Sequence, residues 1–171
     1  MLNLIKTRRS VRKYENEKIS DKDINEIIEA GMYAPSAGNE QAWQFIVVKG
    51  DPLKKILEKN QNVPSSTPCG ILVCNDKRLE KYPGINSSIF DCSAAIQNML
   101  LAAHSKGYGA LWCYVFDANR PAIKELFNIP EGVEPFSFIP IGKSKEGIKE
   151  IPKRFDESKI HFNSFNEKFL K

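Results

Sequence analysis

The sequence predicts an α+β domain, in which helices and strands are interspersed along one chain. Three observations favour this class. Apolar residues recur at helical spacing in several segments, compact β-branched runs lie between these segments, and glycine or proline marks several of the boundaries. The 171 residues suffice for one domain with its own core, and they contain no internal repeat and no low-complexity tract.

The first predicted helix lies between Ser20 and Pro35. Ser20 can cap it, because Asp23 stands three residues later in a capping-box position. Its apolar residues follow at helical spacing: Ile24, Ile27, Ile28 and Met32. The compact β-branched run at residues 44–50 is then the first predicted strand.

The remaining short elements follow from the same patterns. A second helix is predicted over residues 51–60, with Asp51 as its cap and Pro52 at the first helical position. A further short helix is predicted at Ala122 to Phe127. Three more strands are predicted, at residues 70–76, 109–116 and 135–142. The sheet therefore has about four strands.

The longest helical pattern runs from about Ser88 to Lys106, and Gly107 can cap its C-terminal end. Its apolar positions cover more than one face of the helix. A helix that is apolar on several sides must be buried on several sides. We therefore expect it to be either the spine of the monomer or part of a subunit interface.

The chain changes character after Gly142, where it becomes polar and charged. Its aromatic residues there are widely spaced: Phe155, Phe162, Phe165 and Phe169. Such a segment needs another surface to cover these rings. We expect a single domain over residues 1–171, with residues 144–171 as an extended C-terminal arm.

Charge and apolar content narrow the class of protein. The 25 lysines and arginines against 21 acidic residues give a net charge of +4, and the acidic residues are spread along the chain. This balance does not favour a nucleic-acid partner. No segment resembles a signal peptide or reaches the length of about 20 apolar residues that spans a bilayer. We expect a cytoplasmic protein without a membrane partner.

The spacing of the cysteines and the absence of known enzyme motifs argue against several kinds of active site. The four cysteines form no C-x-x-C pair, and two histidines add little, so we expect reduced, packed thiols and no metal site. The glycines of "GYGALW" follow a helix and precede a strand, which reverses the order in a dinucleotide-binding fingerprint. There is no phosphate-binding loop, nucleophile elbow or pair of histidines at metal spacing. If the chain is an enzyme, a bound cofactor would carry its chemistry.

The stretch "TRRSVRKY" places four cations within eight residues. In an extended segment the side chains of Arg8, Ser10 and Arg12 leave the same face, so two guanidinium groups and a hydroxyl can meet one anion, such as a terminal phosphate. A solvated basic surface is the alternative interpretation. A nucleic-acid surface is less favoured, because Tyr14 is the single aromatic residue nearby.

The stretch "APSAGNEQAW" is rich in the residues that form turns, and it connects the first predicted helix to the first predicted strand. Taken alone, it is more often a plain connector. It also offers Ser36, Asn39 and Gln41 beside Trp43, and these groups could bind the amide-rich edge of a ligand.

The two stretches together closely resemble the FMN-dependent nitroreductase family, in which R-R-S-x-R is followed by a helix and then by P-S-A-x-N-x-Q-x-W. The long Ala-rich helix, the later "PIG" and the basic "PKR" also occur in the family's order, so the resemblance covers nearly the whole chain. It implies a nitroreductase-like fold, with a central, mostly antiparallel sheet flanked by helices and a C-terminal arm that reaches the partner subunit. The chain is similar to the shorter members.

The resemblance also implies an FMN site at the interface of a homodimer. The FMN phosphate and ribityl chain would be held by Arg8, Arg9, Ser10, Arg12, Lys153 and Arg154. The isoalloxazine ring would meet four residues of the other subunit: Pro35, Ser36, Asn39 and Gln41. The backbone would approach the flavin at Ile141 and Gly142.

The implied activity is that of an FMN oxidoreductase. NADH or NADPH would reduce the flavin, and an electron-poor small molecule, such as a nitroaromatic or a quinone, would then take the hydride in a ping-pong reaction. No side chain would be catalytic. A non-catalytic flavin or nucleotide binding protein would need the same phosphate cradle and is the alternative. Trp112 is expected in the core beside the cofactor.

Overall fold

The computed structural model describes residues 1–60, 62–147 and 150–165. Its centre is a five-stranded sheet in which β1, β2, β5 and β3 are neighbours in that order, while β4 also pairs with β5, and all of these pairings are antiparallel. The strands are β1 (Trp43–Val48), β2 (Cys69–Asp76), β3 (Gly109–Ala110), β4 (Cys113–Tyr114) and β5 (Val133–Gly142). The α-helices are α1 (Leu2–Thr7), α2 (Asp21–Met32), α3 (Gly50–Lys59), α4 (Ser87–Ser105) and α5 (Arg120–Leu126). The predicted α+β class and antiparallel sheet are confirmed.

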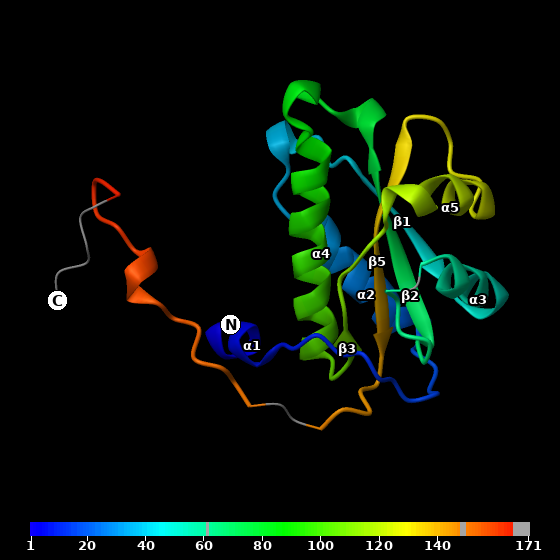
Figure 1. The fold of residues 1–171 in the computed structure, drawn as a ribbon, viewed down its shortest axis with the longest axis horizontal. Coiled ribbons are helices and arrows are strands. Elements are labelled where there is room, and N and C mark those ends of the chain that lie inside the picture. The colour runs from blue at the N-terminus through cyan, green and yellow to red at the C-terminus, as the bar shows by residue number, and fades with distance from the viewer. Residues whose placement is uncertain (61, 148–149, 166–171) are drawn as a thin grey trace.

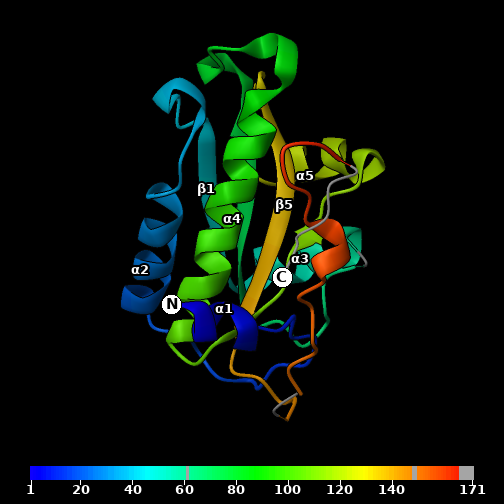
Figure 2. The same cartoon turned by 90° about the vertical axis from the view of Figure 1, so that its left-hand side faces the viewer.

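Helices cover both faces of the sheet. Figures 1 and 2 show α2 and α4 on one face and α3 and α5 on the other. The central strand β2 is buried along its whole length. Because successive side chains of a strand point to opposite faces, Ile71 and Val73 join the core under α2 and α4, whereas Leu72 and Cys74 join the core under α3 and α5.

The strand predicted over residues 109–116 is broken into β3 and β4, so the sheet has five strands instead of about four. The break lies at Leu111 and Trp112, opposite Pro140 of β5. The backbone N–H of Leu111 donates to the carbonyl of Pro140 (3.3 Å). Proline has no N–H to return the bond, so the ladder is interrupted there.

The prediction that Trp112 lies in the core is wrong. Its side chain is 38% exposed and meets the ring of Phe136 edge-on, with 6.5 Å between ring centroids. From Leu111 onward the buried residues alternate: they are Leu111, Cys113 and Val115. Every residue from 110 to 116 is apolar or aromatic, so the sequence pattern could not indicate which alternate set faces inward.

The helix boundaries agree with the prediction in most places. The hydroxyl of Ser20 accepts a hydrogen bond from the Asp23 N–H (3.0 Å) and caps α2 as predicted. The assignments of Asp51 as the cap and Pro52 as the first helical residue are wrong, because α3 begins at Gly50 with Lys49 at the cap position. The Asp51 carboxylate pairs with Lys54 (2.9 Å) instead. The short helix α1 was not predicted. Within the described part of the chain, no helix is long and apolar enough to cross a membrane.

Gly70 lies in the middle of β2, where a side chain would collide with β5. A Cβ atom at this position would overlap the ring of Phe138, which is completely buried. We therefore expect Gly70→Ala to lower the free energy of unfolding by about 1–3 kcal/mol through overpacking. Chemical denaturation would measure this loss. Gly84→Ala is the matched control, because no atom lies within 4 Å of its added Cβ; equal stability of the two variants would contradict the prediction.

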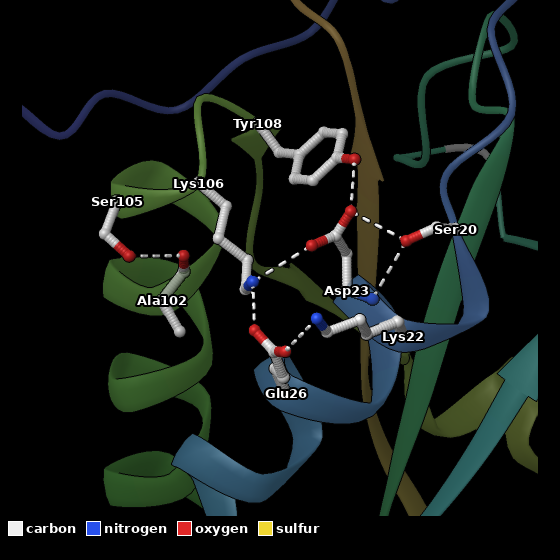
Figure 3. Close-up of polar contacts among 8 residues, drawn as sticks. All are labelled: Ser20, Lys22, Asp23, Glu26, Ala102, Ser105, Lys106 and Tyr108. Atoms are coloured by element: carbon white, nitrogen blue, oxygen red, sulfur yellow. Dashed lines mark hydrogen bonds and ion pairs between the residues drawn. The ribbon is translucent and has the colours of Figure 1, made fainter.

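A cluster of charged side chains joins the start of α2 to the end of α4 (Figure 3). The ammonium of Lys106 bonds the Asp23 carboxylate (2.9 Å) and also pairs with Glu26. The Asp23 carboxylate accepts further hydrogen bonds from the hydroxyls of Ser20 (2.7 Å) and Tyr108 (2.9 Å). These bonds, that from Lys106 first, lower the pKa of Asp23 from 3.8 to about 2.

We expect Asp23→Asn to remove a stabilisation that depends on pH. Because folding lowers the pKa of Asp23, the stabilisation is present above about pH 3.8 and is lost as the pH falls through about 2. Thermal midpoints measured from pH 7 to pH 2 should show wild type above the variant at neutral pH and the two converging in acid. Glu58→Gln, an exposed carboxyl on α3, is the control; a constant difference between wild type and Asp23→Asn would contradict the prediction.

Candidate functional site

The segment that follows α1, residues 8–14, is called the cationic segment; it runs extended along the edge of the sheet. Ser10 forms a parallel bridge with Ala110, and the N–H of Val11 donates to the carbonyl of Ala110 (3.1 Å). Farther on, Tyr14 pairs with Ser144. The segment is therefore strand-like, and Arg8, Ser10 and Arg12 alternate with residues of the opposite face, as predicted for an extended chain.

Arg8 lies beside a hollow of about 440 Å³ between α1 and the segment 151–155. Arg9, Lys153 and Arg154 line the same hollow. Within the described residues, the guanidinium group of Arg8 forms no hydrogen bond and no ion pair. Burial lowers the pKa of Arg8, and the nearby charges of Arg154 and Arg9 lower it further. Cations that crowd together without an anion, two half-buried and two exposed, are suited to a phosphate group.

The guanidinium group of Arg9 is used differently. It donates to the carbonyls of Lys6 and Arg8 (both 2.8 Å) and to the carbonyl of Glu150 (3.1 Å). Arg9 thus fixes the start of the C-terminal segment against the end of α1, in addition to lining the hollow. Arg12 is exposed, and its backbone N–H donates to the Glu146 carboxylate (2.6 Å).

The "PIG" end of β5 meets the cationic segment. The side chain of Ile141 is fully buried, so only its backbone could reach a ligand. Gly142 fits closely, because an added Cβ would lie 2.7 Å from Cγ of Pro68 and 3.0 Å from Cδ1 of Tyr14. The absence of a side chain at Gly142 lets these segments approach one another.

The loop at residues 35–42 is a tight turn. Gly38, Asn39 and Gln41 have φ angles of 52°, 55° and 50°, in the left-handed region that costs energy for residues other than glycine. The hydroxyl of Ser36 accepts from the Gln41 N–H (3.2 Å), and Lys81 Nζ donates to the Gly38 carbonyl (2.7 Å). Pro35, Asn39 and Gln41 are exposed, and Ser36 is half-buried. The loop therefore presents polar groups from a strongly constrained backbone.

The structure gathers the basic residues but leaves this loop far from them. Near the start of α4, the Asp91 carboxylate accepts from the Ala37 N–H of the loop (2.9 Å). Near the end of α4, Nε2 of His104 lies 2.9 Å from the hydroxyl of Thr7, just before the cationic segment. At 1.5 Å of rise per residue, these two contacts are about 20 Å apart along the helix. The loop and the arginines lie at opposite ends of α4 (Figure 1).

Three residues near the site were not assigned to it from the sequence, although His104 was expected near the end of a helix. His104 ties α1 to α4, and the buried carboxyls of Glu40 and Asp91 lie under the loop. A carboxyl within the apolar pattern of α4 was the one indication in the sequence that Asp91 is buried.

The cysteines offer no nucleophile. All four are free and buried, and burial raises the pKa of Cys69 to about 11 and those of Cys74 and Cys113 to about 12. Burial raises the pKa of Cys92 as well. These thiols are therefore neutral near pH 7. In the part of the chain that the structure describes, no three His, Cys, Asp or Glu side chains are placed to hold a metal ion.

Comparison with known proteins identifies the family. The model of the "Nitroreductase family" matches residues 5–64 and 54–143. A protein of Archaeoglobus fulgidus named "Putative NADH dehydrogenase/NAD(P)H nitroreductase" is 43% identical over 168 residues, which cover 94% of this chain and 95% of the relative. The solved structure of an "FMN-dependent Nitroreductase" from Clostridium difficile R20291 superposes with a TM-score of 0.83 at 29% identity, covering 96% of this chain and 100% of that one. This chain belongs to the nitroreductase family.

Proposed function

We propose that this chain is an FMN-dependent oxidoreductase that uses NADH or NADPH to reduce an electron-poor small molecule, such as a nitroaromatic or a quinone. Family membership and the names of the relatives support an NAD(P)H-dependent oxidoreductase. The observation that carries the proposal is the set of half-buried and exposed cations around Arg8, which lack an anion within the described residues.

The residues around this hollow fit the phosphate end of FMN. Arg8 would form a charge-assisted pair with the phosphate, and Lys153 and Arg154 would add charge from the opposite wall. Ser10 and Arg12 follow on the same face of the extended segment and would meet the ribityl chain. Arg9, held by three backbone carbonyls, would keep the two walls together.

The bound flavin would supply the hydride chemistry that no side chain of this chain can provide. The protein's part is to bind, orient and shield. The exposed amides of Asn39 and Gln41 and the hydroxyl of Ser36 would hydrogen-bond the polar edge of the ring system. A ping-pong reaction follows if donor and acceptor use one pocket in turn, so that the oxidised donor leaves before the acceptor enters.

The separation of the two parts of the site supports a homodimer. The arginines lie at the C-terminal end of α4 and the loop lies at its N-terminal end, about 20 Å away. A two-fold axis perpendicular to α4 would bring the loop of one subunit beside the arginines of its partner. Each of the two FMN sites would then need both chains.

The C-terminal residues support the same assembly. After β5, the chain first follows the cationic segment, with the Lys145 N–H donating to the Lys13 carbonyl (2.9 Å), and then leaves the body of the domain (Figure 1). Phe155 and Phe165 are exposed there, and Phe169 lies outside the described residues. We propose that residues 144–171 form an arm of the single domain and that these rings pack on the partner subunit.

Purified protein tests the function directly. It should be yellow, or become so with added FMN, and its flavin absorption should bleach with NADH or NADPH and recover with an electron-poor acceptor. Steady-state rates with each donor and a panel of nitroaromatics and quinones would define the reaction. A colourless protein that does not take up FMN would overturn the proposal. Flavin binding without oxidation of NADH or NADPH would instead favour a non-catalytic flavin binding protein. Such a protein would need the same cations around the phosphate.

A further inference from the structure

Three polar side chains are buried together beneath the loop that contains Asn39 and Gln41. Glu40 is 7% exposed, Asp91 is 3% exposed and Ser87 is 1% exposed. Glu40 belongs to the loop, and the other two belong to the first turns of α4. A buried charged group is costly unless hydrogen bonds or an opposite charge compensate it. The contacts of these three side chains therefore indicate which of the carboxyls is charged.

One oxygen of each carboxyl group holds the backbone. Asp91 Oδ1 accepts from the Ala37 N–H (2.9 Å), and Glu40 Oε2 accepts from the Lys81 N–H (2.7 Å). The other oxygens, Glu40 Oε1 and Asp91 Oδ2, have no donor among the described residues, and neither does the Ser87 hydroxyl. The two carboxyls nevertheless lie within hydrogen-bonding reach of each other. A proton between them supplies the missing donor.

Burial and the surrounding charges favour Asp91 as the protonated member of the pair. Burial raises the pKa of Asp91, and the carboxyls of Glu40 and Glu80 raise it further, against the lowering effect of the Ala37 N–H. Burial alone would raise the pKa of Glu40, but the nearby Ser87 hydroxyl, the Lys81 N–H and the Asp91 carboxyl lower it. The other polar neighbours are Lys81, Glu80 and Cys92. Lys81 Nζ bonds the Gly38 carbonyl, and its positive charge also lowers the pKa of Glu40. Glu80 accepts from Ser88, and burial raises the pKa of the Cys92 thiol.

We propose that a proton shared between Asp91 and Glu40 holds the loop at residues 36–41 in its ligand-facing conformation. Asp91 and Glu40 are thus positioning residues for the proposed flavin site, and the functional part of this inference rests on the proposed function. Loss of the proton places two negative charges side by side in a buried position. The loop would then loosen, because its left-handed residues persist only while their surroundings hold them.

Hydrogen exchange on the full chain without added flavin tests this lock. Asp91→Asn replaces the proton by a permanent donor, since its amide can donate to Glu40 Oε1 while Oδ1 still accepts from Ala37. From pH 5 to 9.5, the exchange rate of loop peptides in wild type, divided by that in Asp91→Asn at the same pH, should rise by up to about tenfold per pH unit once the proton is lost. Dividing by the variant cancels the intrinsic pH dependence of exchange. A ratio that stays constant overturns the proposal.

Three further variants separate the shared proton from general destabilisation. Glu40→Gln supplies a permanent donor from the other member of the pair. The exchange rate of its loop peptides, divided by that of Asp91→Asn, should therefore stay constant with pH. Glu80→Gln removes a nearby carboxyl that accepts from Ser88 of α4, and it should keep the rise in the exchange ratio, displaced to lower pH because Glu80 raises the pKa of Asp91. Asp91→Ala leaves the Ala37 N–H without its acceptor and should speed exchange of the loop at every pH. If this variant does not fold, Glu40→Gln and Glu80→Gln still test whether the shared proton causes the rise. A rise abolished equally by Glu80→Gln would overturn the assignment to Asp91 and Glu40.

A flavin titration then connects the lock to the site. Because the FMN phosphate itself titrates at about pH 6, the dissociation constant of wild type is divided by that of Asp91→Asn at each pH. This ratio should rise with pH. A protein that binds no FMN would refute the proposed function but leave the exchange result intact. FMN binding whose pH dependence is the same in both proteins would refute the positioning role alone.

Discussion

Replacing Arg8 by alanine is expected to weaken FMN binding by about 1.5–3 kcal/mol, the range for a hydrogen bond to a charged group. This corresponds to a dissociation constant on the order of 10-fold to 150-fold higher. The half-buried guanidinium group lies beside Arg9 and Arg154 and has no anion of its own within the described residues. Its removal therefore costs the protein no native hydrogen bond, and the fold should survive.

Lys13→Ala is the matched control for Arg8→Ala. It removes the same charge from the same segment, but Lys13 is exposed and does not line the hollow. Titration of flavin fluorescence at low and moderate salt would separate a direct contact from general attraction, because screening reduces the latter. Wild-type affinity in Arg8→Ala would show that "TRRSVRKY" is a solvated surface and that the phosphate is bound elsewhere.

The elements that the sequence predicted well are those with one strong local pattern. The capping box at Ser20 sets the start of α2, and the long apolar pattern sets α4 to within one residue at each end. The errors arise where partners distant in sequence decide the outcome. Pro140 divides the strand predicted over residues 109–116, and no local pattern could reveal which residue of β5 faces it.

The candidate site was predictable to the extent that short motifs carry it. The resemblance selected Arg8, Lys153 and Arg154 from two ends of the chain, and the structure brings all three to one hollow. The pair of Asp91 and Glu40 could not be found this way. Each is a single carboxyl in its own segment, and only the packing of the loop on α4 buries them together.

In the proposed dimer, each FMN site is a composite site built from two chains. The exposed side of α4 is the surface through which we expect these chains to meet. Inside one chain, the helix buries Ile96, Met99 and Leu100 against α2 and the sheet. Phe90, in its first turns, is 66% exposed, although it lies on a helix that is more apolar than α2 or α3. A large aromatic side chain in such a position is typical of an interface that is covered in the assembled protein.

Phe90→Asp is therefore expected to separate the dimer into folded monomers. Because Phe90 is exposed in one chain, the monomer should keep its thermal stability, whereas an aspartate enclosed at the interface would raise the dimer dissociation constant by about 100-fold or more. FMN affinity should fall in parallel, since each flavin would lose the loop of the partner. Sedimentation velocity at low micromolar concentration, with and without FMN, measures both effects. Lys55→Asp places a carboxylate on the exposed surface of α3, on the face of the sheet opposite α4, and should remain dimeric. A Phe90→Asp dimer that keeps its flavin would move the interface elsewhere, and a tight, flavin-loaded monomer would overturn the composite site.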